Sequence, residues 1–202
     1  MNKVFFDLAS AESPDRYKLL TGLVVPRPIG WIGTKRPDGS HNLAPFSFFN
    51  VVSTTPPVVV FSAGSHAERP KDSSYFAESS GEFSVNIVSE EVVEAMAVTS
   101  GSFTADDDEF AIAGLTPLPG KMIEAPLVAE SPANLECRVT RILDLGEARR
   151  SRLVVGVVVA IHVREDVLDG TRIDHDVLRA VGRMAGNTYI HTRARFDIAR
   201  PS

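Results

Sequence analysis

The chain has 202 residues, of which 44% are apolar and 23% are charged, and these proportions exclude a disordered or collagen-like protein. Lysine and arginine number 21 against 26 aspartate and glutamate residues, so the net charge of −5 gives no overall field that attracts nucleic acid or an anionic membrane. The single cysteine, Cys137, forms no intramolecular disulfide, and no leader or membrane-length apolar run is visible. We therefore expect one domain, residues 1–202, in the cytoplasm, with no nucleic-acid or membrane partner.

Short runs rich in β-branched residues and phenylalanine, bounded by Pro, Gly, Asp and Asn, predict a mainly β fold of the barrel or sandwich type. In chain order, the expected strands are 29–34, 45–52, 58–62, 83–88, 135–145 and 153–164. The sequence Arg36-Pro-Asp-Gly39 predicts the turn of a hairpin between 26–34 and 42–50. Helical patterns cover only 15–21, 71–79 and 90–99, the last with Ser89 as its expected cap.

The segment 153–163 is apolar at nearly every position. A strand with one solvated face alternates apolar and polar residues, so both faces of this strand are expected to be buried. Either a helix or a second subunit covers the outer face. Because few helices are predicted, we favour a homodimer.

Several common motifs are missing. No Gly-x-Gly-x-x-Gly follows a strand, Gly114–Lys121 departs from the spacing of a phosphate-binding P-loop, and no Gly-x-Ser-x-Gly is present. The five histidines are isolated from one another and from Cys137, so no metal site is expected. We interpret the acidic run 106–109 as a solvated loop, because it lacks the glycine and glutamate spacing of a calcium loop.

The first segment that suits a ligand is 42–50. Pro45 interrupts the hydrogen-bonding edge of the hairpin, and Ser47 and Asn50 add polar groups beside three phenylalanines. A wall of aromatic side chains with neighbouring polar groups suits a ligand that has a flat amphipathic ring. The same residues also fit an ordinary core beside an edge proline, and periodicity does not separate the two.

The second segment is 62–76, which leaves a strand, crosses a loop with two cations and enters a helix near Asp72. Helix N–H groups and cations together bind anions. The groups that can converge on a phosphate are Arg69, Lys71 and the hydroxyls of Ser62, Ser65 and Ser73. The alternative is a solvated helix start, capped by Asp72 or Ser73.

Eight segments in order resemble the blocks of one family. They are PRPIGWIGT (26–34), NLAPFSFFN (42–50), PPVVVF (56–61), RPKDS (69–73), GEFSVN (81–86), DEFAIAGL (108–115), LEC (135–137) and GRMAGNTY (182–189). The chain is similar to the flavin reductase-like proteins, which have an FMN-binding split β-barrel. The resemblance implies a Greek-key antiparallel barrel of about six strands with a few short helices. It also implies a homodimer, FMN near the subunit boundary, and NADH or NADPH as electron donor.

The resemblance assigns site residues by position. Those expected along the isoalloxazine ring are Asn42, Ala44, Pro45, Phe46 and Ser47, with Thr34 near the ring or ribityl chain and Tyr189 over the flavin. Those expected to hold the phosphate are Arg69, Lys71 and Ser73, together with Ser62. No side chain is expected to be an indispensable acid, base or nucleophile, because the cofactor carries the redox chemistry.

The leading hypothesis is an NAD(P)H-dependent flavin oxidoreductase that passes electrons to a partner oxygenase or another acceptor. Alternatives are an electron carrier of the flavoredoxin type, a dimeric binding module that lacks a cofactor, and a split barrel for haem or pyridoxal phosphate. Arg69 and Lys71 argue against the cofactor-free module, and no histidine has an evident haem-ligand setting. The loop 99–110 is expected either to cover the flavin and select a partner or to be a plain surface loop.

Overall fold

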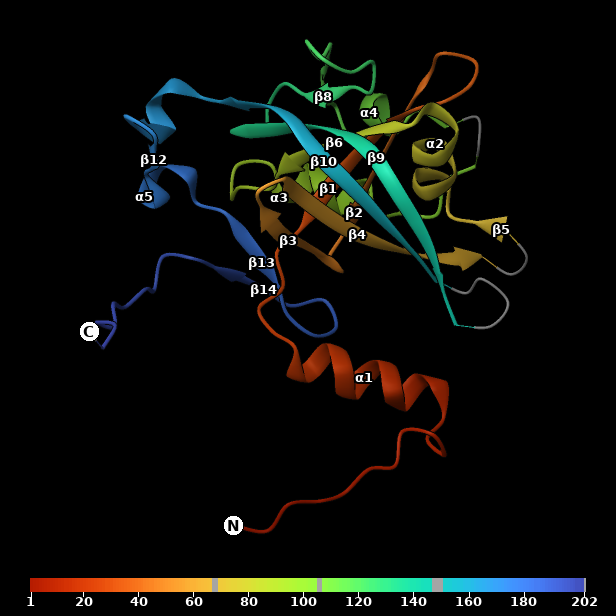
Figure 1. Cartoon of the computed structure of the whole chain (residues 1–202), viewed down its shortest axis with the longest axis vertical. Helices are drawn as coiled ribbons and strands as arrows, with labels where there is room; N and C mark the ends of the chain where they lie inside the picture. The colour runs from red at the N-terminus through yellow and green to blue at the C-terminus, as the bar shows by residue number, and fades with distance from the viewer. Residues whose placement is uncertain (67–68, 105–106, 147–150, 202) are drawn as a thin grey trace.

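The computed structural model describes residues 1–66, 69–104, 107–146 and 151–201. Its main element is an eight-stranded antiparallel sheet with strands in the order β2-β1-β6-β9-β10-β4-β3 and β5 paired to β4 (Figure 1). The strands are β1 (Gly30–Lys35), β2 (His41–Phe46), β3 (Phe49–Thr54), β4 (Pro57–His66), β5 (Arg69–Pro70), β6 (Glu82–Ile87), β9 (Ala133–Leu145) and β10 (Ser151–Val163). The mainly β, split-barrel prediction is confirmed.

Smaller elements surround this sheet. The helices are α1 (Ser13–Leu23), α2 (Asp72–Ser80), α3 (Val93–Val98), α4 (Glu109–Ile112), α5 (His175–Leu178) and the 3₁₀ turn η2 (Glu165–Val167). The short strand pairs are β7 (Pro117–Leu118) with β8 (Leu127–Val128), β11 (Leu168–Asp169) with β12 (Arg172–Ile173), and β13 (Val181–Arg183) with β14 (Tyr189–His191). None of the helices described is long and apolar enough to cross a membrane.

Two apolar clusters flank the β1–β2 hairpin. Successive side chains of a strand point to opposite faces, and accordingly Ile32 packs with Phe61 and Phe83 in one cluster. Trp31, its neighbour in β1, packs in the other cluster with Met96 of α3. Burial on both faces fixes the hairpin rigidly and with it β2, the end strand of the sheet.

The hairpin confirms the predicted turn at 36–39, because β1 and β2 pair from Gly30–Phe46 to Lys35–His41. The single strand expected over 45–52 is wrong. The chain bends between Phe46 and Phe49, so that β2 pairs with β1 and β3 pairs with β4. Pro45 is tolerated in β2 because an end strand needs ladder bonds on one side only.

The helical predictions succeed to different degrees. The second helix begins at Asp72 as expected and ends before Gly81, whose φ of 76° is the left-handed conformation that favours glycine. The third helix, expected over 90–99, begins three residues later than expected, at Val93. Ser89 does not cap it: the Ser89 backbone bridges to Ala180, and its hydroxyl accepts the N–H of Glu91. A tertiary contact therefore replaces the expected first turn.

The apolar strand β10 buries one face only within a single chain. Arg152, Val154 and Gly156 are buried, whereas the alternate residues Val155 and Val157 are half-buried. The expectation that both faces are buried is therefore not met by the chain alone.

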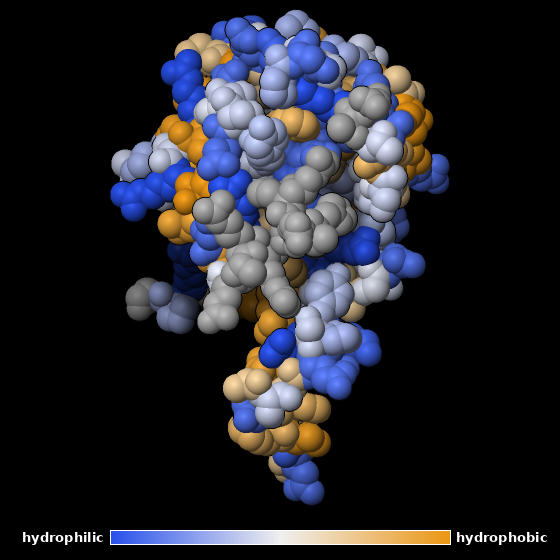
Figure 2. Space-filling view, turned by 90° about the vertical axis from the view of Figure 1, so that its right-hand side faces the viewer, coloured by the Kyte–Doolittle hydropathy of each residue, from blue (hydrophilic) through white to orange (hydrophobic). Residues whose placement is uncertain are grey.

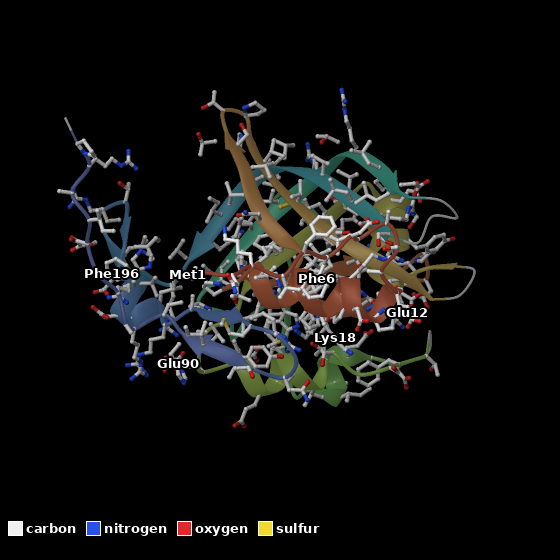
Figure 3. The ribbon with its side chains drawn as sticks, turned by 90° about the horizontal axis from the view of Figure 1, so that it is seen from below. Met1, Phe6, Glu12, Lys18, Glu90 and Phe196 are labelled. Carbon is white, nitrogen blue, oxygen red and sulfur yellow. The ribbon has the colours of Figure 1, made fainter. Side chains whose placement is uncertain are left out.

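The helix α1 and the residues before it project from the barrel (Figure 1), and Figure 2 shows apolar surface on this projection. Leu20 and Leu23 of α1 are 51% and 77% exposed, and Phe5 is 87% exposed. Seen from below, α1 lies across this side of the molecule; it begins next to the labelled Glu12 and includes the labelled Lys18 (Figure 3). Large exposed apolar areas of this kind mark interaction surfaces.

Candidate functional site

A pocket of about 890 Å³ runs along β2, a volume in the usual range for small-molecule and cofactor sites. Five separated parts of the chain form its wall. They are Tyr17, Arg27 and Ile29; Asn42 with 44–48; Ser62, Gly64 and 71–73; Met96, 99–103 and Glu109; and Arg183, Met184, Gly186 and Tyr189. Long-range strand pairing, rather than any local motif, brings these parts together.

The structure brings most of the expected site residues to this pocket. Those that line it are Asn42, Ala44, Pro45, Phe46, Ser47, Ser62, Lys71, Ser73 and Tyr189. Thr34 does not line the pocket but is buried behind Asn42, which donates to its hydroxyl. Arg69 lies in β5, and its side chain is outside the described part of the structure.

Asn42 links the edge strand to helix α2. Its buried Nδ2 donates to Thr34 Oγ1 at 3.1 Å and to Ser73 Oγ at 3.0 Å. Because Ser73 accepts this hydrogen bond, its hydroxyl proton remains available as a donor. The first turn of α2 is thereby held against β2 with a hydroxyl donor at the pocket wall.

Lys71 precedes this turn and supplies a cation. Its ammonium lies over the ring of Phe46, 5.8 Å from the centroid. The first N–H groups of a helix carry partial positive charge, and the start of α2 faces the pocket through Asp72 and Ser73. An apolar floor therefore meets a group of positive donors, although Asp72 adds an acidic side chain to the same turn.

The C-terminal hairpin β13–β14 forms another wall. Arg183 lies over the ring of Tyr189, 4.5 Å from its centroid, and donates to the Tyr189 hydroxyl and to the carbonyl of Gly186. The backbones of Arg183 and Arg27 exchange two hydrogen bonds of 2.8 and 3.0 Å. The hairpin is thus tied to the chain that enters β1.

The loop that follows α3 contributes its first half to the pocket. Residues 99–103 line the pocket, and Trp31 Nε1 donates to Thr99 Oγ1 at 2.9 Å. The position of 99–103 agrees with the interpretation of 99–110 as a cover for the site, which stays a prediction. Residues 105 and 106 lie outside the described part.

The acidic run corrects one expectation. Glu109 is buried rather than solvated, lines the pocket and pairs with Arg36 Nη2 at 3.2 Å. Burial raises the pKa of the Glu109 carboxyl, and the nearby Arg36 charge opposes part of that rise. Asp108 caps α4 by accepting the N–H groups of Phe110 and Ala111, and Asp106 is outside the described residues.

Other reactive side chains lie elsewhere. Burial, together with the charge of Glu136, raises the pKa of the Cys137 thiol, which makes it a poor nucleophile. None of the histidines whose side chains are described lines the pocket. His162 instead contacts the buried carboxylate of Glu136, and His41 packs edge-on against Phe110.

Comparison with known proteins places this geometry in a family. The flavin reductase like domain matches residues 22–188, a span that contains nearly all of the pocket wall. The chain belongs to the flavin reductase-like family. A protein of Deinococcus radiodurans is 41% identical to this flavin reductase-like chain, with 99% of the chain and 91% of that protein covered.

Two solved structures are also similar to this family member. Nitrilotriacetate monooxygenase component B from Bacillus cereus has a TM-score of 0.95 and 32% identity, covering 98% of this chain and all of that one. The 2-nitrobenzoate 2-nitroreductase NbaA of Pseudomonas fluorescens has a TM-score of 0.90 and 27% identity, covering 98% and 97%. Both likenesses extend over the whole barrel and its projecting helix.

Sequence reasoning missed several residues of the wall. Arg27, Glu109 and Arg183 all line the pocket, yet none was assigned a place there. Arg27 and Arg183 lie within segments that carry the family resemblance, and a positive charge in such a segment is the only signal that pointed to them. Their convergence depends on backbone pairing across more than 150 residues.

Proposed function

We propose that this protein binds FMN in the pocket along β2 and is an NAD(P)H-dependent flavin oxidoreductase. The observation that carries the proposal is the pocket itself, where an apolar edge strand meets the cation and the helix start at Lys71 and Ser73. A flat ring fits against the strand, and an anionic tail fits the positive end. Membership of the flavin reductase-like family supports the same ligand.

The residues present fit FMN. Residues 42–47 provide the wall for the ring, and β2 is the end strand of the sheet, so the N–H and C=O groups of its outer edge have no strand partner. Lys71 and the hydroxyl of Ser73 suit the phosphate, with Arg69 and Ser62 as the further assigned partners. Tyr189 lines the pocket from the C-terminal hairpin.

When bound, FMN would supply the redox chemistry, which is hydride transfer from NADH or NADPH. The chain itself orients the ring against β2 and offers donors from the strand edge and from Ser47. The first half of the loop after α3, residues 99–103, excludes water from one side of the pocket. Cys137 and the histidines whose side chains the structure describes lie away from the pocket and take no part in this work.

We further propose that the protein is a cytoplasmic homodimer that passes electrons to a partner oxygenase or another electron-transfer protein. A solved relative at 32% identity is a component B of a monooxygenase, which favours an oxygenase component as acceptor. The exposed apolar side chains of α1 and of the preceding arm support a second copy as partner.

Two measurements on the purified protein test the function. Titration with FMN should show flavin binding at micromolar concentration, and anaerobic addition of NADH or NADPH should then bleach the bound flavin. A deuteride at the transferred position should slow the bleaching. A protein that binds FMN without being bleached by either nucleotide would be an electron carrier or binding module instead, and one that binds no flavin would contradict the proposal altogether.

A further inference from the structure

Arg27 is a buried cation without an ionic partner. It is 7% exposed, and the acceptors of its guanidinium are all neutral: the carbonyls of Thr21, Val24 and Met184 and the hydroxyl of Ser47. Among the described residues no carboxylate pairs with it. A buried charge is ordinarily paired, so this one calls for a counter-charge.

The donors of Arg27 are not all used. Nη1 donates to Thr21 at 2.7 Å and to Val24 at 2.6 Å, Nη2 donates to Met184 at 2.9 Å, and Nε points to Ser47 Oγ at 3.4 Å. A guanidinium has five N–H donors, which leaves one on Nη2 with no acceptor in the described part of the chain. Because Arg27 lines the pocket, the pocket is where an acceptor for it can lie.

Arg27 also sets the direction of the neighbouring hydroxyl. Ser47 Oγ accepts from Arg27 Nε, and a hydroxyl that accepts from a cation turns its own proton away from it. Ser47 lines the same pocket. The pair therefore presents two donors and a positive charge to any ligand there.

This donor pair lies just past one end of β2 (His41–Phe46), whereas Asn42 and Ser73 meet near the other end. The Lys71 ammonium lies between them, over the ring of Phe46. Asn42, bonded to Ser73 at the start of α2, precedes Ser47 by five residues, which is up to about 17 Å along an extended chain. An elongated ligand with its anionic tail near Ser73 would bring its opposite end toward Arg27 and Ser47.

We propose that Arg27 and Ser47 form a donor site for the acceptor edge of the flavin ring, and that the Arg27 charge stabilises FMN more when it is reduced than when it is oxidised. This inference rests on the proposed FMN binding. Reduction by two electrons with uptake of one proton leaves the ring with one more negative charge than before, and a nearby buried cation lowers the energy of that charge.

The first test separates the two ends of the pocket by ligand. The probes are FMN, riboflavin and lumiflavin, the last having neither ribityl chain nor phosphate. Ser47→Ala should weaken all three by a similar factor, about tenfold, whereas Lys71→Ala should weaken FMN alone. If Ser47→Ala leaves lumiflavin binding unchanged, the ring edge does not lie at this site.

The second test measures the charge. Arg27→Gln should lower the affinity for reduced FMN about tenfold more than that for oxidised FMN, which is a fall of about 30 mV in the two-electron midpoint potential. Arg27→Lys, which keeps the charge, should stay near the wild-type potential. A purely structural role would weaken both redox forms equally and leave the potential unchanged, and that result would overturn the inference.

Arg27 also ties α1 to the C-terminal hairpin, so Arg27→Gln could fail to fold. In that case Arg27→Lys and Ser47→Ala are the variants that test it: if the inference holds, Arg27→Lys keeps the midpoint potential and Ser47→Ala binds lumiflavin about tenfold more weakly. Wild-type protein that binds no FMN would contradict the proposed function itself. Wild-type protein that binds FMN with neither variant effect would contradict only the role of Arg27 and Ser47.

Discussion

Lys71 puts a positive charge over an aromatic floor at the start of a helix. In the proposed complex this ammonium forms a charge-assisted hydrogen bond to the FMN phosphate, and such bonds contribute about 1.5–3 kcal/mol. Lys71→Ala should therefore weaken FMN roughly ten- to hundredfold and leave riboflavin almost unaffected, as fluorescence titration can measure. Lys18→Ala, an exposed lysine of α1, is the matched control. Equal losses for FMN and riboflavin would place the phosphate elsewhere.

Glu136 is a buried carboxylate with a structural task. It accepts the N–H groups of Lys121, Met122 and Ile123 and contacts His162. Burial alone would raise the pKa of Glu136, but the His162 and backbone hydrogen bonds outweigh burial and lower it. A carboxyl with a lowered folded pKa stabilises the protein above the ordinary glutamate value of about 4.3, and this contribution is lost as the pH falls through the folded pKa.

We therefore expect Glu136→Gln to cost about 3 kcal/mol of unfolding free energy at pH 7, because it leaves buried N–H groups facing an amide. Urea unfolding at fixed protein concentration should show the difference from wild type shrinking as the pH falls below the ordinary glutamate pKa of about 4.3. The control is Glu165→Gln, at an exposed position in η2. It should change neither the unfolding free energy at pH 7 nor its dependence on pH. A Glu136→Gln loss that is independent of pH would assign the effect to packing rather than to charge.

At the scale of elements, sequence patterns locate strands well when each strand is bounded by turn residues. The hairpin with its turn at 36–39 and the helix α2, which ends before Gly81, were predictable for this reason. The bend between Phe46 and Phe49 was not, because the apolar run continues through it and only pairing with different neighbours divides it. The two- and three-residue strands of the C-terminal part likewise depend on tertiary contacts that no local pattern contains.

The candidate site divides in the same way. The segment 42–47, which contains most of the edge strand β2, and the helix start at Lys71 and Ser73 form from local sequence. Both were predicted to lie in one site. Arg27, Glu109 and Arg183 enter the pocket from three other parts of the chain. The burial of Glu109 beside Arg36 reverses its expected exposure, since an acidic run in sequence carries no sign of a buried arginine that lies 73 residues away.

Close packing behind β1 gives a prediction for an element. A Cβ on Gly33 would overlap the carbonyl oxygen of Pro126 and the hydroxyl of Ser84, which are themselves hydrogen-bonded at 2.5 Å. Gly33→Ala should lower the unfolding free energy by about 2 kcal/mol, because this core strand cannot shift without breaking its pairing on both sides. Chemical denaturation measures the change.

The control for this substitution is Gly22→Ala in α1, where an added Cβ meets nothing within 4 Å. It should leave stability unchanged or raise it by up to about 1 kcal/mol, the difference in helix propensity. If the Gly33→Ala variant is as stable as wild type, the prediction is wrong, and Pro126 and Ser84 can shift to accommodate the added Cβ.

At the scale of the whole molecule, a single copy leaves too much apolar surface exposed. Leu20 and Leu23 of α1 face solvent, as does the arm before them (Figures 1 and 2), and the second face of β10 is only half-covered. At about 25 cal/mol per Å² of apolar surface, solvent exposure of such side chains forgoes substantial stabilisation. A second copy of the chain would recover it and would explain why α1 stands apart from its own barrel.

The proposed homodimer therefore predicts a particle of twice 21.9 kDa in light scattering at micromolar concentration. Leu20→Glu with Leu23→Glu should shift the mass toward one chain, since two buried carboxylates without partners would oppose association. Lys18→Glu on the same helix, at a side chain that is already polar and 74% exposed, should leave the dimer intact. FMN affinity measured on the dissociated double variant then shows whether the pocket needs the second copy, because Tyr17 of α1 lines it. A light-scattering mass of one chain for the wild-type protein would contradict the dimer. The exposed apolar face of α1 would then have to contact a different partner.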